Sequence, residues 1–268
     1  MSVLARLLLL TLTLCLLPPA MAAQLVRVGA YHFPPYVTKP ESPAPAGLLP
    51  ELLAALNAAQ DDYRFELLPT SVTRRYRDFT QGRYDLILFE SPSWGWQGVE
   101  LDKLDLQISD AEVYVARAEP GRGQDYFASL RGKRMALYSG YHYGFAGFNA
   151  DQEYLRRTFR AVLTYSHDSN LRMLLHGRAE LSVVPRSYLH LYQQSNPLER
   201  ERLLVSARTD QVYHHHALLR RNGPLGAQAL AELLARLQAS GRLAQLLERY
   251  QLHATSDAVL EQADPMQL

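Results

Sequence analysis

The sequence has very little cysteine. Cys15 is the single one in 268 residues, and it lies in an apolar run near the N-terminus. One cysteine cannot form a disulfide within the chain, so the hydrophobic core must stabilise the fold. Hydrophobic residues make up 47% of the chain and charged residues 21%, a composition that indicates a globular protein rather than a fibrous or disordered one.

The sequence also lacks an excess of charge of either sign. It has 28 lysines and arginines against 27 aspartates and glutamates, which gives a formal net charge of +1. A nucleic-acid-binding surface needs a basic field, so DNA and RNA are not expected partners. After the N-terminal leader there is no apolar run of the roughly 20 residues that a membrane-spanning helix needs. We therefore expect a soluble mature chain.

The first 22 residues have the order of a secretory signal. Arg6 precedes an eleven-residue apolar run at 7–17, and two prolines and the small residues around Ala22 follow it. We predict a signal peptide at 1–22, cleavage after Ala22 and export to the periplasm, which removes Cys15. A lipoprotein signal is the alternative, but the sequence has Leu14 where such a signal has a small residue.

Short β-like runs alternate with helical patterns from residue 25 onward, which indicates an α/β fold. The predicted strands cover residues 25–30, 64–68, 85–89, 112–117, 134–138, 161–164, 180–184 and 213–219. The first predicted helix begins near residue 50, and three more cover residues 72–81, 151–159 and 169–176. Two leucine stripes with helical spacing, at 230–237 and 243–250, predict the last two helices. Open α/β sheets bind ligands beyond the carboxyl ends of their strands, so the site is expected in the loops there.

Several short motifs occur in an order that resembles the family 3 periplasmic solute-binding proteins, which supply amino-acid ABC importers. They span nearly the whole mature chain, and they are Tyr31-His32-Phe33-Pro34-Pro35-Tyr36, Gly47, Gly82-Arg83-Tyr84-Asp85, Leu130-Arg131-Gly132-Lys133, Ser139-Gly140, the segment 174–180, and Gly241-Arg242-Leu243 before Tyr250. Exported, neutral and cysteine-poor character agrees with this resemblance.

The resemblance implies a two-lobed clamshell of the type II periplasmic-binding-protein fold, with a hinge where the chain crosses near residues 110 and 211. Lobe 1 would be residues 25–111 plus 212–253, lobe 2 would be residues 112–211, and residues 254–268 would form a frayed tail. A small-molecule ligand would lie between the lobes. The expected partner is an ABC transporter permease or a membrane sensor, with the protein itself a monomer that needs no cofactor or metal.

The sequence departs from the family pattern at two positions that hold amino acids. Binders of amino acids carry an arginine soon after the third strand, which pairs with the ligand carboxylate. The segment 90–97 has no arginine here. An aspartate that holds the ligand ammonium is replaced by Pro185, followed by Arg186. The usual mode of holding an α-amino acid is therefore not expected.

The loops that face the predicted cleft are rich in aromatic residues, which suit a planar, cyclic or cationic ligand. They are Tyr31, Phe33, Tyr36, Trp94, Trp96, Tyr141 and Tyr143. The alternative is that these rings only pack the loops together under the hinge.

Polar residues complete the candidate ligand site. Arg74 matches an arginine that some family members direct toward the cleft, although Arg75 and Arg77 flank it and such a run also indicates a solvated helix face. Glu90 ends a buried strand, where it would hold a ligand cation or pair with a neighbouring arginine. The remaining candidates are Ser91, Ser139, His142, His167 and Arg186.

Two further patterns are interpreted as structural. His214 and His216 share one face of a strand while His215 points away, which leaves too few ligands for a metal. Asp168 and Ser169 follow His167 as in part of a hydrolase triad, but they lie where helix N-caps are expected.

Three functions remain open from the sequence. The first is a non-enzymatic protein that closes around a small polar or aromatic solute and delivers it to an importer or sensor. The second is an enzyme on the same scaffold, similar to cyclohexadienyl dehydratases, with Glu90, His142 or His167 as the acid or base. The third is a degenerate clamshell that binds a protein partner through an exposed aromatic patch.

Overall fold

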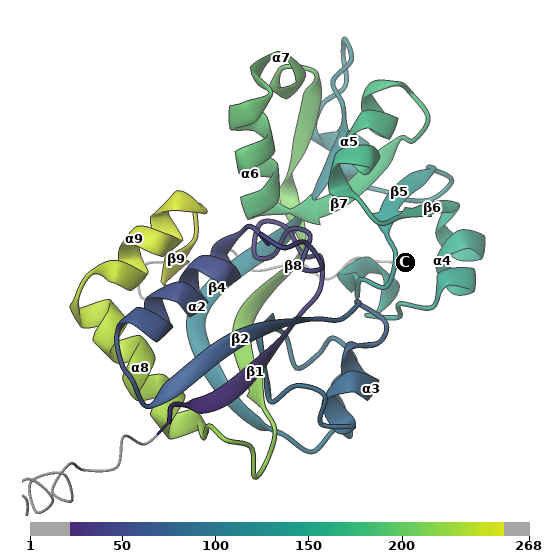
Figure 1. The fold of residues 1–268 in the computed structure, drawn as a ribbon. Helices are drawn as coiled ribbons and strands as arrows, with labels where there is room; N and C mark the ends of the chain where they lie inside the picture. Colours follow the sequence, from purple (N-terminus) through teal and green to yellow (C-terminus); the bar gives the residue numbers. More distant parts are fainter. Residues whose placement is uncertain (1–21, 255–268) are drawn as a thin grey trace, which may run out of the picture.

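The computed structural model describes residues 22–254, so the predicted signal peptide and tail lie almost entirely outside the described residues. Within them the strands form one nine-stranded sheet with the order β2-β1-β3-β8-β4-β7-β5-β6, and β9 pairs with β4 (Figure 1). The strands are β1 (Gln24–Ala30), β2 (Tyr63–Pro69), β3 (Leu86–Glu90), β4 (Asp102–Arg117), β5 (Met135–Tyr138), β6 (Ala161–Thr164), β7 (Leu181–Pro185), β8 (Leu203–Leu219) and β9 (His253–Ala254). This arrangement confirms the α/β prediction.

Helices cover the sheet at both of its ends. Figure 1 shows α2, α8 and α9 beside β1 and β2, and α4 to α7 around β5, β6 and β7. The helices are α2 (Leu48–Ala58), α3 (Arg75–Thr80), α4 (Gln152–Phe159), α5 (His167–Leu175), α6 (Arg186–Ser195), α7 (Pro197–Arg200), α8 (Ala227–Ala239) and α9 (Arg242–Arg249), with 3₁₀ turns η1 (Gln124–Phe127) and η2 (Gly144–Ala146). None of the helices in residues 22–254 is long and apolar enough to cross a membrane.

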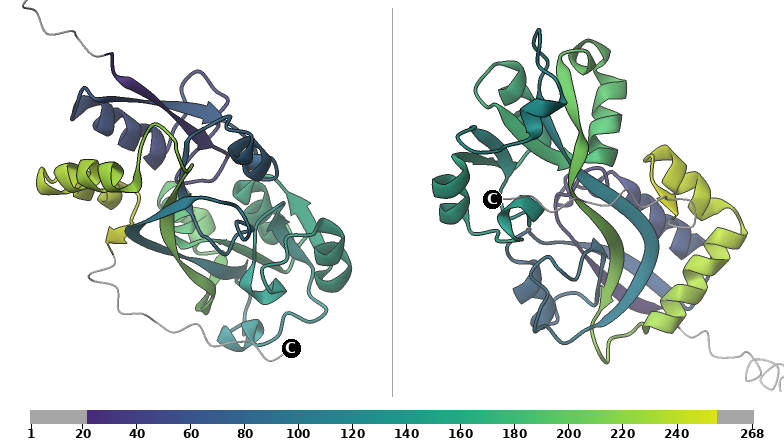
Figure 2. Two further views of the ribbon diagram at one scale, coloured as in Figure 1. Left: turned by 90° about the horizontal axis from the view of Figure 1, so that it is seen from below. Right: turned by 180° about the vertical axis from the view of Figure 1, so that it is seen from behind.

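Two long strands, β4 and β8, connect the two ends of the sheet. They pair antiparallel from Asp102↔Leu219 at one end to Arg117↔Leu203 at the other, with a register shift between Glu112 and Val113. β8 also pairs with β3 in lobe 1, whereas β4 pairs with β7 in lobe 2. Figure 2 shows both strands running from one half of the molecule to the other. The division into lobes at residues 111 and 112 and at 211 and 212 stays a prediction.

The apolar periodicity of the sequence corresponds to burial in the structure. In α8 the side chains of Leu230, Leu233 and Leu237 are buried, as the leucine stripe predicts. All five residues of β3 are buried, in agreement with its continuous apolar run. A second cluster in lobe 2 packs Leu171 and Leu174 of α5 and Leu189 of α6 against Val184 of β7.

The predictions for β4 and β8 were wrong about where these strands begin. β4 begins at residue 102 rather than 112, although Leu104, Leu106 and Ile108 alternate with polar residues as a half-exposed strand requires. β8 begins at residue 203 rather than 213. The prediction missed its first half because Ser206 and the polar residues at 208–211 interrupt the apolar pattern where the chain passes between the lobes.

The predicted helix boundaries also need correction. α3 begins at Arg75 rather than at 72, and α6 was not predicted. Ser166 is the N-cap of α5, and its hydroxyl accepts a hydrogen bond from the backbone N–H of Ser169. Asp168 is therefore not the cap but pairs with Arg172 at 3.0 Å on the helix surface.

A buried carboxylate connects three strands of lobe 1. Asp85, which is 5% exposed, accepts hydrogen bonds from Arg27 Nε at 2.9 Å and Nη2 at 2.7 Å, and from Arg220 Nη1 at 3.3 Å. Burial acts to raise the pKa of Asp85, but the hydrogen bonds from Arg27 outweigh it and hold the pKa below its ordinary value.

Asp85→Asn should lower the free energy of unfolding by about 1–3 kcal/mol at pH 7, because it removes the countercharge of two arginines and replaces one acceptor oxygen with an NH2 donor. Since the pKa is lower in the folded state, this loss should shrink as the pH falls below the unfolded-state value of Asp85. Urea unfolding at pH 7 and pH 3 measures both effects. Glu66→Gln, which removes an exposed ion pair with Arg64, is the control and should change stability by less than about 1 kcal/mol. Equal stability of Asp85→Asn and the parent at pH 7 would contradict the account.

Candidate ligand-binding site

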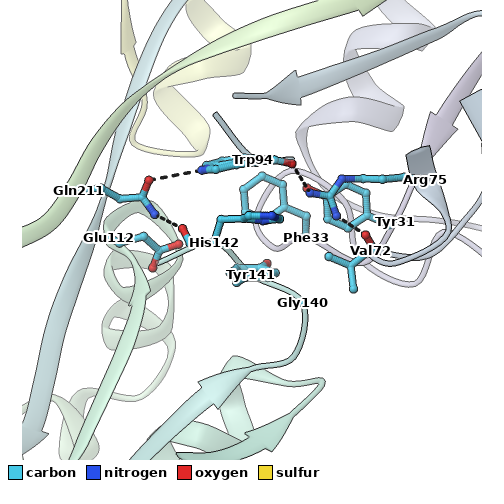
Figure 3. Close-up of a pocket in the computed structure, with 10 residues that line it drawn as sticks. All are labelled: Tyr31, Phe33, Val72, Arg75, Trp94, Glu112, Gly140, Tyr141, His142 and Gln211. Atoms are coloured by element: carbon cyan, nitrogen blue, oxygen red, sulfur yellow. Dashed lines mark hydrogen bonds between the residues drawn. The ribbon is translucent and has the colours of Figure 1, made fainter. Parts of the chain in front are cut away.

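A small pocket lies between the lobes at the carboxyl ends of β1, β3 and β5, where the sequence places the site. Its cavity volume is about 10 Å³, which is room for one water-sized group. The residues that line it come from loops of both lobes and from the crossing strands, as Figure 3 shows, and they are Tyr31, Phe33, Val72, Arg75, Trp94, Glu112, Gly140, Tyr141, His142 and Gln211.

Aromatic rings from the two lobes contact each other in this pocket. Phe33 stacks on Tyr31 with 5.7 Å between ring centroids. Its edge-on contacts reach Trp94 at 5.9 Å in lobe 1 and Tyr141 at 5.7 Å in lobe 2. Such pairs add stability beyond the area they bury. Phe33 is therefore the centre of an aromatic contact that extends across the cleft.

Hydrogen bonds to Gln211 of β8 connect the same loops. Trp94 Nε1 donates to Gln211 Oε1 at 3.3 Å, and Gln211 Nε2 donates to the carbonyl oxygen of His142 at 2.6 Å. Gly140 allows the close approach of the lobes, because a Cβ atom there would lie 2.9 Å from Val72 Cγ1 and the residue has φ +83°.

Arg75 is the cation of the pocket, and it is almost completely buried at 1% exposed. Its Nε lies 3.2 Å from Glu90 Oε1, and its Nη groups donate to the carbonyl oxygens of Val72 and, at 3.4 Å, Trp94. The other oxygen of Glu90 accepts a hydrogen bond from Trp96 Nε1 at 2.7 Å. Burial raises the pKa of Glu90 while the charge of Arg75 opposes this effect. The pair therefore neutralises one end of the pocket.

Glu112 is a buried acidic residue of the pocket lining itself. It is 2% exposed, and its Oε2 has no hydrogen-bond partner among the residues that the structure describes. Burial raises the pKa of Glu112 well above its ordinary value, and the nearby carboxylates of Asp210 and Asp110 add to the effect. Unpartnered buried carboxylates are rare in folded proteins and require an explanation.

Both histidines of the candidate set are held in the neutral form. Burial, with a smaller contribution from Arg75, lowers the pKa of His142 to about 4. Burial lowers the pKa of His167 to about 3, and its Nε2 lies 3.3 Å from the hydroxyl of Tyr141. Neither imidazole is charged at neutral pH.

The structure brings five of the fourteen predicted site residues together around the pocket. They are Tyr31, Phe33, Trp94, Tyr141 and His142.

The other predicted site residues lie behind or away from the pocket lining. Buried members of this group have partners inside the protein. Tyr36 donates a hydrogen bond to Asp110 at 2.8 Å, and the hydroxyl of Tyr143 accepts one from the backbone N–H of Tyr138. Glu90 is bound by Arg75 and Trp96. His167 contacts the hydroxyl of Tyr141 but does not itself line the pocket. Ser91 shares a hydrogen bond with Ser93, and Ser139 accepts one from Gln152.

Arg74 and Arg186 lie on the protein surface. Arg74 is exposed just before α3, and the next residue, Arg75, enters the cleft in its place. Arg186 is exposed at the start of α6, whereas its neighbour Ser187 is buried and donates to Asp110.

Three polar residues of the pocket were not predicted from the sequence. Arg75 was treated only as a neighbour of Arg74, and Gln211 was placed at a chain crossing. Glu112 carried a usable signal, because it is an isolated acid in the apolar run 111–116 of a strand. A carboxylate in such a run indicates a buried charge with a function or a partner.

The three consecutive histidines alternate across β8 as predicted. His215 is fully buried among Tyr36, Phe89 and Tyr213, whereas its two neighbours are partly exposed. Within the part of the chain that the structure covers, no cluster of three or more potential ligand side chains could hold a metal ion.

The fold is that of the type II periplasmic binding proteins, as solved structures with low sequence identity show. A substrate-binding protein of an ABC uptake transporter from Streptococcus pneumoniae, with bound histidine, has a TM-score of 0.64 at 15% identity over 84% of this chain and 92% of that one. An ancestral amino-acid-binding protein described as a precursor of cyclohexadienyl dehydratase has a TM-score of 0.62 at 14% identity, covering 84% and 94%. A histidine kinase sensor domain similar to periplasmic binding proteins has a TM-score of 0.63 at 21% identity, over 85% of this chain and 96% of that one.

The family follows from a sequence profile. The profile described as "ABC transporter, phosphonate, periplasmic substrate-binding protein" matches residues 48–262. The chain belongs to this family. The comparison with curated proteins finds no match. The expected membership of a binding-protein family is thus confirmed at this level, whereas the narrower family 3 assignment is not.

Arg75→Met should lower the free energy of unfolding by about 3–5 kcal/mol, because it leaves Glu90 buried without its countercharge. The double variant Arg75→Met/Glu90→Gln should recover much of that loss. Arg74→Met is the matched control on the exposed neighbour and should stay within about 0.5 kcal/mol of the parent. Urea unfolding of the four proteins measures the cycle, and equal effects of the Arg74 and Arg75 changes would refute the assignment of Arg75 to the cleft.

Proposed function

We propose that the protein is a periplasmic solute-binding protein that closes around a small solute and delivers it to an ABC importer. The contact of Phe33 in lobe 1 with Tyr141 in lobe 2 is the observation that carries this proposal, because both rings lie in the loops where the fold binds ligands. Family membership supports the assignment to transport. The predicted signal peptide supports a periplasmic location, and a permease or a membrane sensor is the proposed receiving partner.

The crossing strands are the proposed hinge. Asp110 of β4 accepts hydrogen bonds from Tyr36 of lobe 1 and Ser187 of lobe 2. Asp210 of β8 accepts them from the hydroxyl of Tyr114 and the backbone N–H groups of residues 144 and 145. A cavity of about 10 Å³ admits no solute larger than a water molecule. The lobes must therefore part before a solute enters and close again around it.

The pocket does not favour a phosphonate dianion as the solute. Of the described residues that line it, Arg75 is the one cation and it is already paired with Glu90, while Glu112 adds a further acid. An anion would lie near a carboxylate without gaining a free guanidinium. The aromatic lining instead suits a solute with a planar, cyclic or cationic part.

The side chains that the sequence offers as acid or base favour a binding role over a catalytic one. A general acid works best when its pKa lies near the operating pH. Burial holds the pKa of His142 at about 4 and that of His167 at about 3, and Glu90 is bound by Arg75 and Trp96. None of the three acid–base candidates named from the sequence is therefore suited to catalysis, which supports a non-enzymatic role.

A thermal-shift screen of purified protein, unfolded and refolded to remove carried solute, tests the proposal. The panel contains amino acids, polyamines, aromatic acids, nucleosides, sugars, peptidoglycan fragments and phosphonates. A solute at 100 times its Kd should stabilise the protein by about 2.7 kcal/mol. No shift with any solute, from protein that melts cooperatively, would contradict the proposed function.

Phe33→Ala and Tyr141→Ala should each weaken binding of the solute found in that screen by at least about tenfold, because each removes one side of the aromatic contact. Calorimetric titration measures the affinities. Tyr165→Ala is the control, since Tyr165 is 64% exposed and lies outside the pocket lining. Loss of affinity in one cleft variant alone would argue against a solute held between the lobes.

A further inference from the structure

Glu112 is the carboxylate of the pocket lining, and no hydrogen bond or ion pair within the described residues accounts for its burial. It lies on β4 at the register shift with β8, opposite Gln211 on β8 and Pro185 on β7. Its carboxylate lines the pocket, its residue is 2% exposed, and Oε2 has no hydrogen-bond partner in the described part of the chain. Figure 3 shows Glu112 and Arg75 at opposite ends of the pocket, with Phe33 and Tyr141 between them.

The charged and titratable groups around Glu112 do not compensate its charge. Asp110 on its own strand and Asp210 on β8 are carboxylates, and their influence acts against ionisation of Glu112. Four phenols are influenced by Glu112 and are neutral below a strongly raised pKa: Tyr36 from the loop after β1, Tyr141 and Tyr143 from the loop after β5, and Tyr213 from β8. Arg75 at the other end is paired with Glu90. Arg208 of β8 acts on Asp210 and Tyr114, and it is not among the groups that shift the pKa of Glu112. An ionised Glu112 therefore needs a cation from outside the protein.

The neighbouring rings suit such a cation. Phe33, Trp94 and Tyr141 line the same pocket as Glu112, and aromatic faces attract organic cations at short range. A carboxylate combined with several rings binds ammonium and amidinium groups through both charge and ring contacts.

We propose that Glu112 is the specificity-determining residue of the cleft and holds the cationic group of the solute, an organic ammonium or amidinium. This inference rests on the proposed binding function and names its ligand class. It also supplies a reason for closure. In the closed protein Glu112 is buried, so a cation that pairs with it stabilises the closed state more than the open one, and this difference drives the population shift.

Three matched pairs of solutes test the charge requirement in the intact protein. They are choline with dimethylbutanol, its uncharged carbon isostere, putrescine with butanediol, and benzamidine with benzamide. We expect at least one cation to raise the melting temperature and bind at least tenfold more tightly than its neutral partner. This comparison needs no variant, so it does not depend on whether a substitution folds.

Glu112→Gln keeps the volume of the side chain and removes its charge. We expect it to lose at least tenfold in affinity for that cation while affinity for the neutral partner changes little. Glu180→Gln is the control, because Glu180 is a partly exposed carboxylate of lobe 2 that pairs with Arg134 outside the pocket. It should keep the full preference for the cation.

Titration calorimetry in buffers of different ionisation enthalpy adds a second measurement. Since burial raises the pKa of Glu112, a bound cation should expel a proton below that pKa, and affinity should rise with pH. Glu112→Gln should abolish this proton release, whereas Glu180→Gln should keep it.

The outcomes separate the two proposals. Binding of neutral or anionic solutes at least as tight as that of cations, or an unchanged cation preference in Glu112→Gln, overturns the role of Glu112 and leaves the binding function intact. Failure of every solute in the panel, with cations included, overturns both.

Discussion

The antiparallel pairing of β4 with β8 is the constraint on which the rest of the structure depends. These strands connect the two ends of the sheet, since β8 pairs with β3 at one end and β4 pairs with β7 at the other. One of the register shifts between them lies between Glu112 and Val113. Asp110, Asp210 and Gln211 lie at the same level and bind loops of both lobes. One feature of the backbone thus determines the proposed hinge and the position of the pocket wall.

The second organising feature is the separation of charge within the cleft. Arg75 and Glu90 neutralise each other at one end and anchor the loop that carries Trp94 and Trp96. At the other end Glu112 has no such partner within residues 22–254. A buried ion pair contributes little net stability, but removal of one partner is costly. The same physics explains why an unpaired acid in a closing cleft is best matched by a cation on the solute.

The sequence predicted the architecture better than the site. Alternation of strands and helices and the leucine stripe of α8 follow from burial on one face, which is a local property. The aromatic loops were also predictable, since the carboxyl ends of strands converge. The choice between Arg74 and Arg75 was not predictable, because neighbouring side chains on a helix point about 100° apart and the sequence does not fix the residue at which the helix begins. Glu112 was missed because strand periodicity places an acid in the core without showing which groups surround it.

The most direct test of the account is a distance measurement across the cleft. Residues 22–254 contain no cysteine, so spin labels attached through Thr80→Cys on α3 and Thr158→Cys on α4, both exposed positions, report on the lobes without background. Closure around a ligand predicts a broad or long distance distribution for the stripped protein that sharpens to a shorter distance when a stabilising cationic solute is added. A distribution that does not change with a solute that stabilises the protein would contradict closure around a ligand.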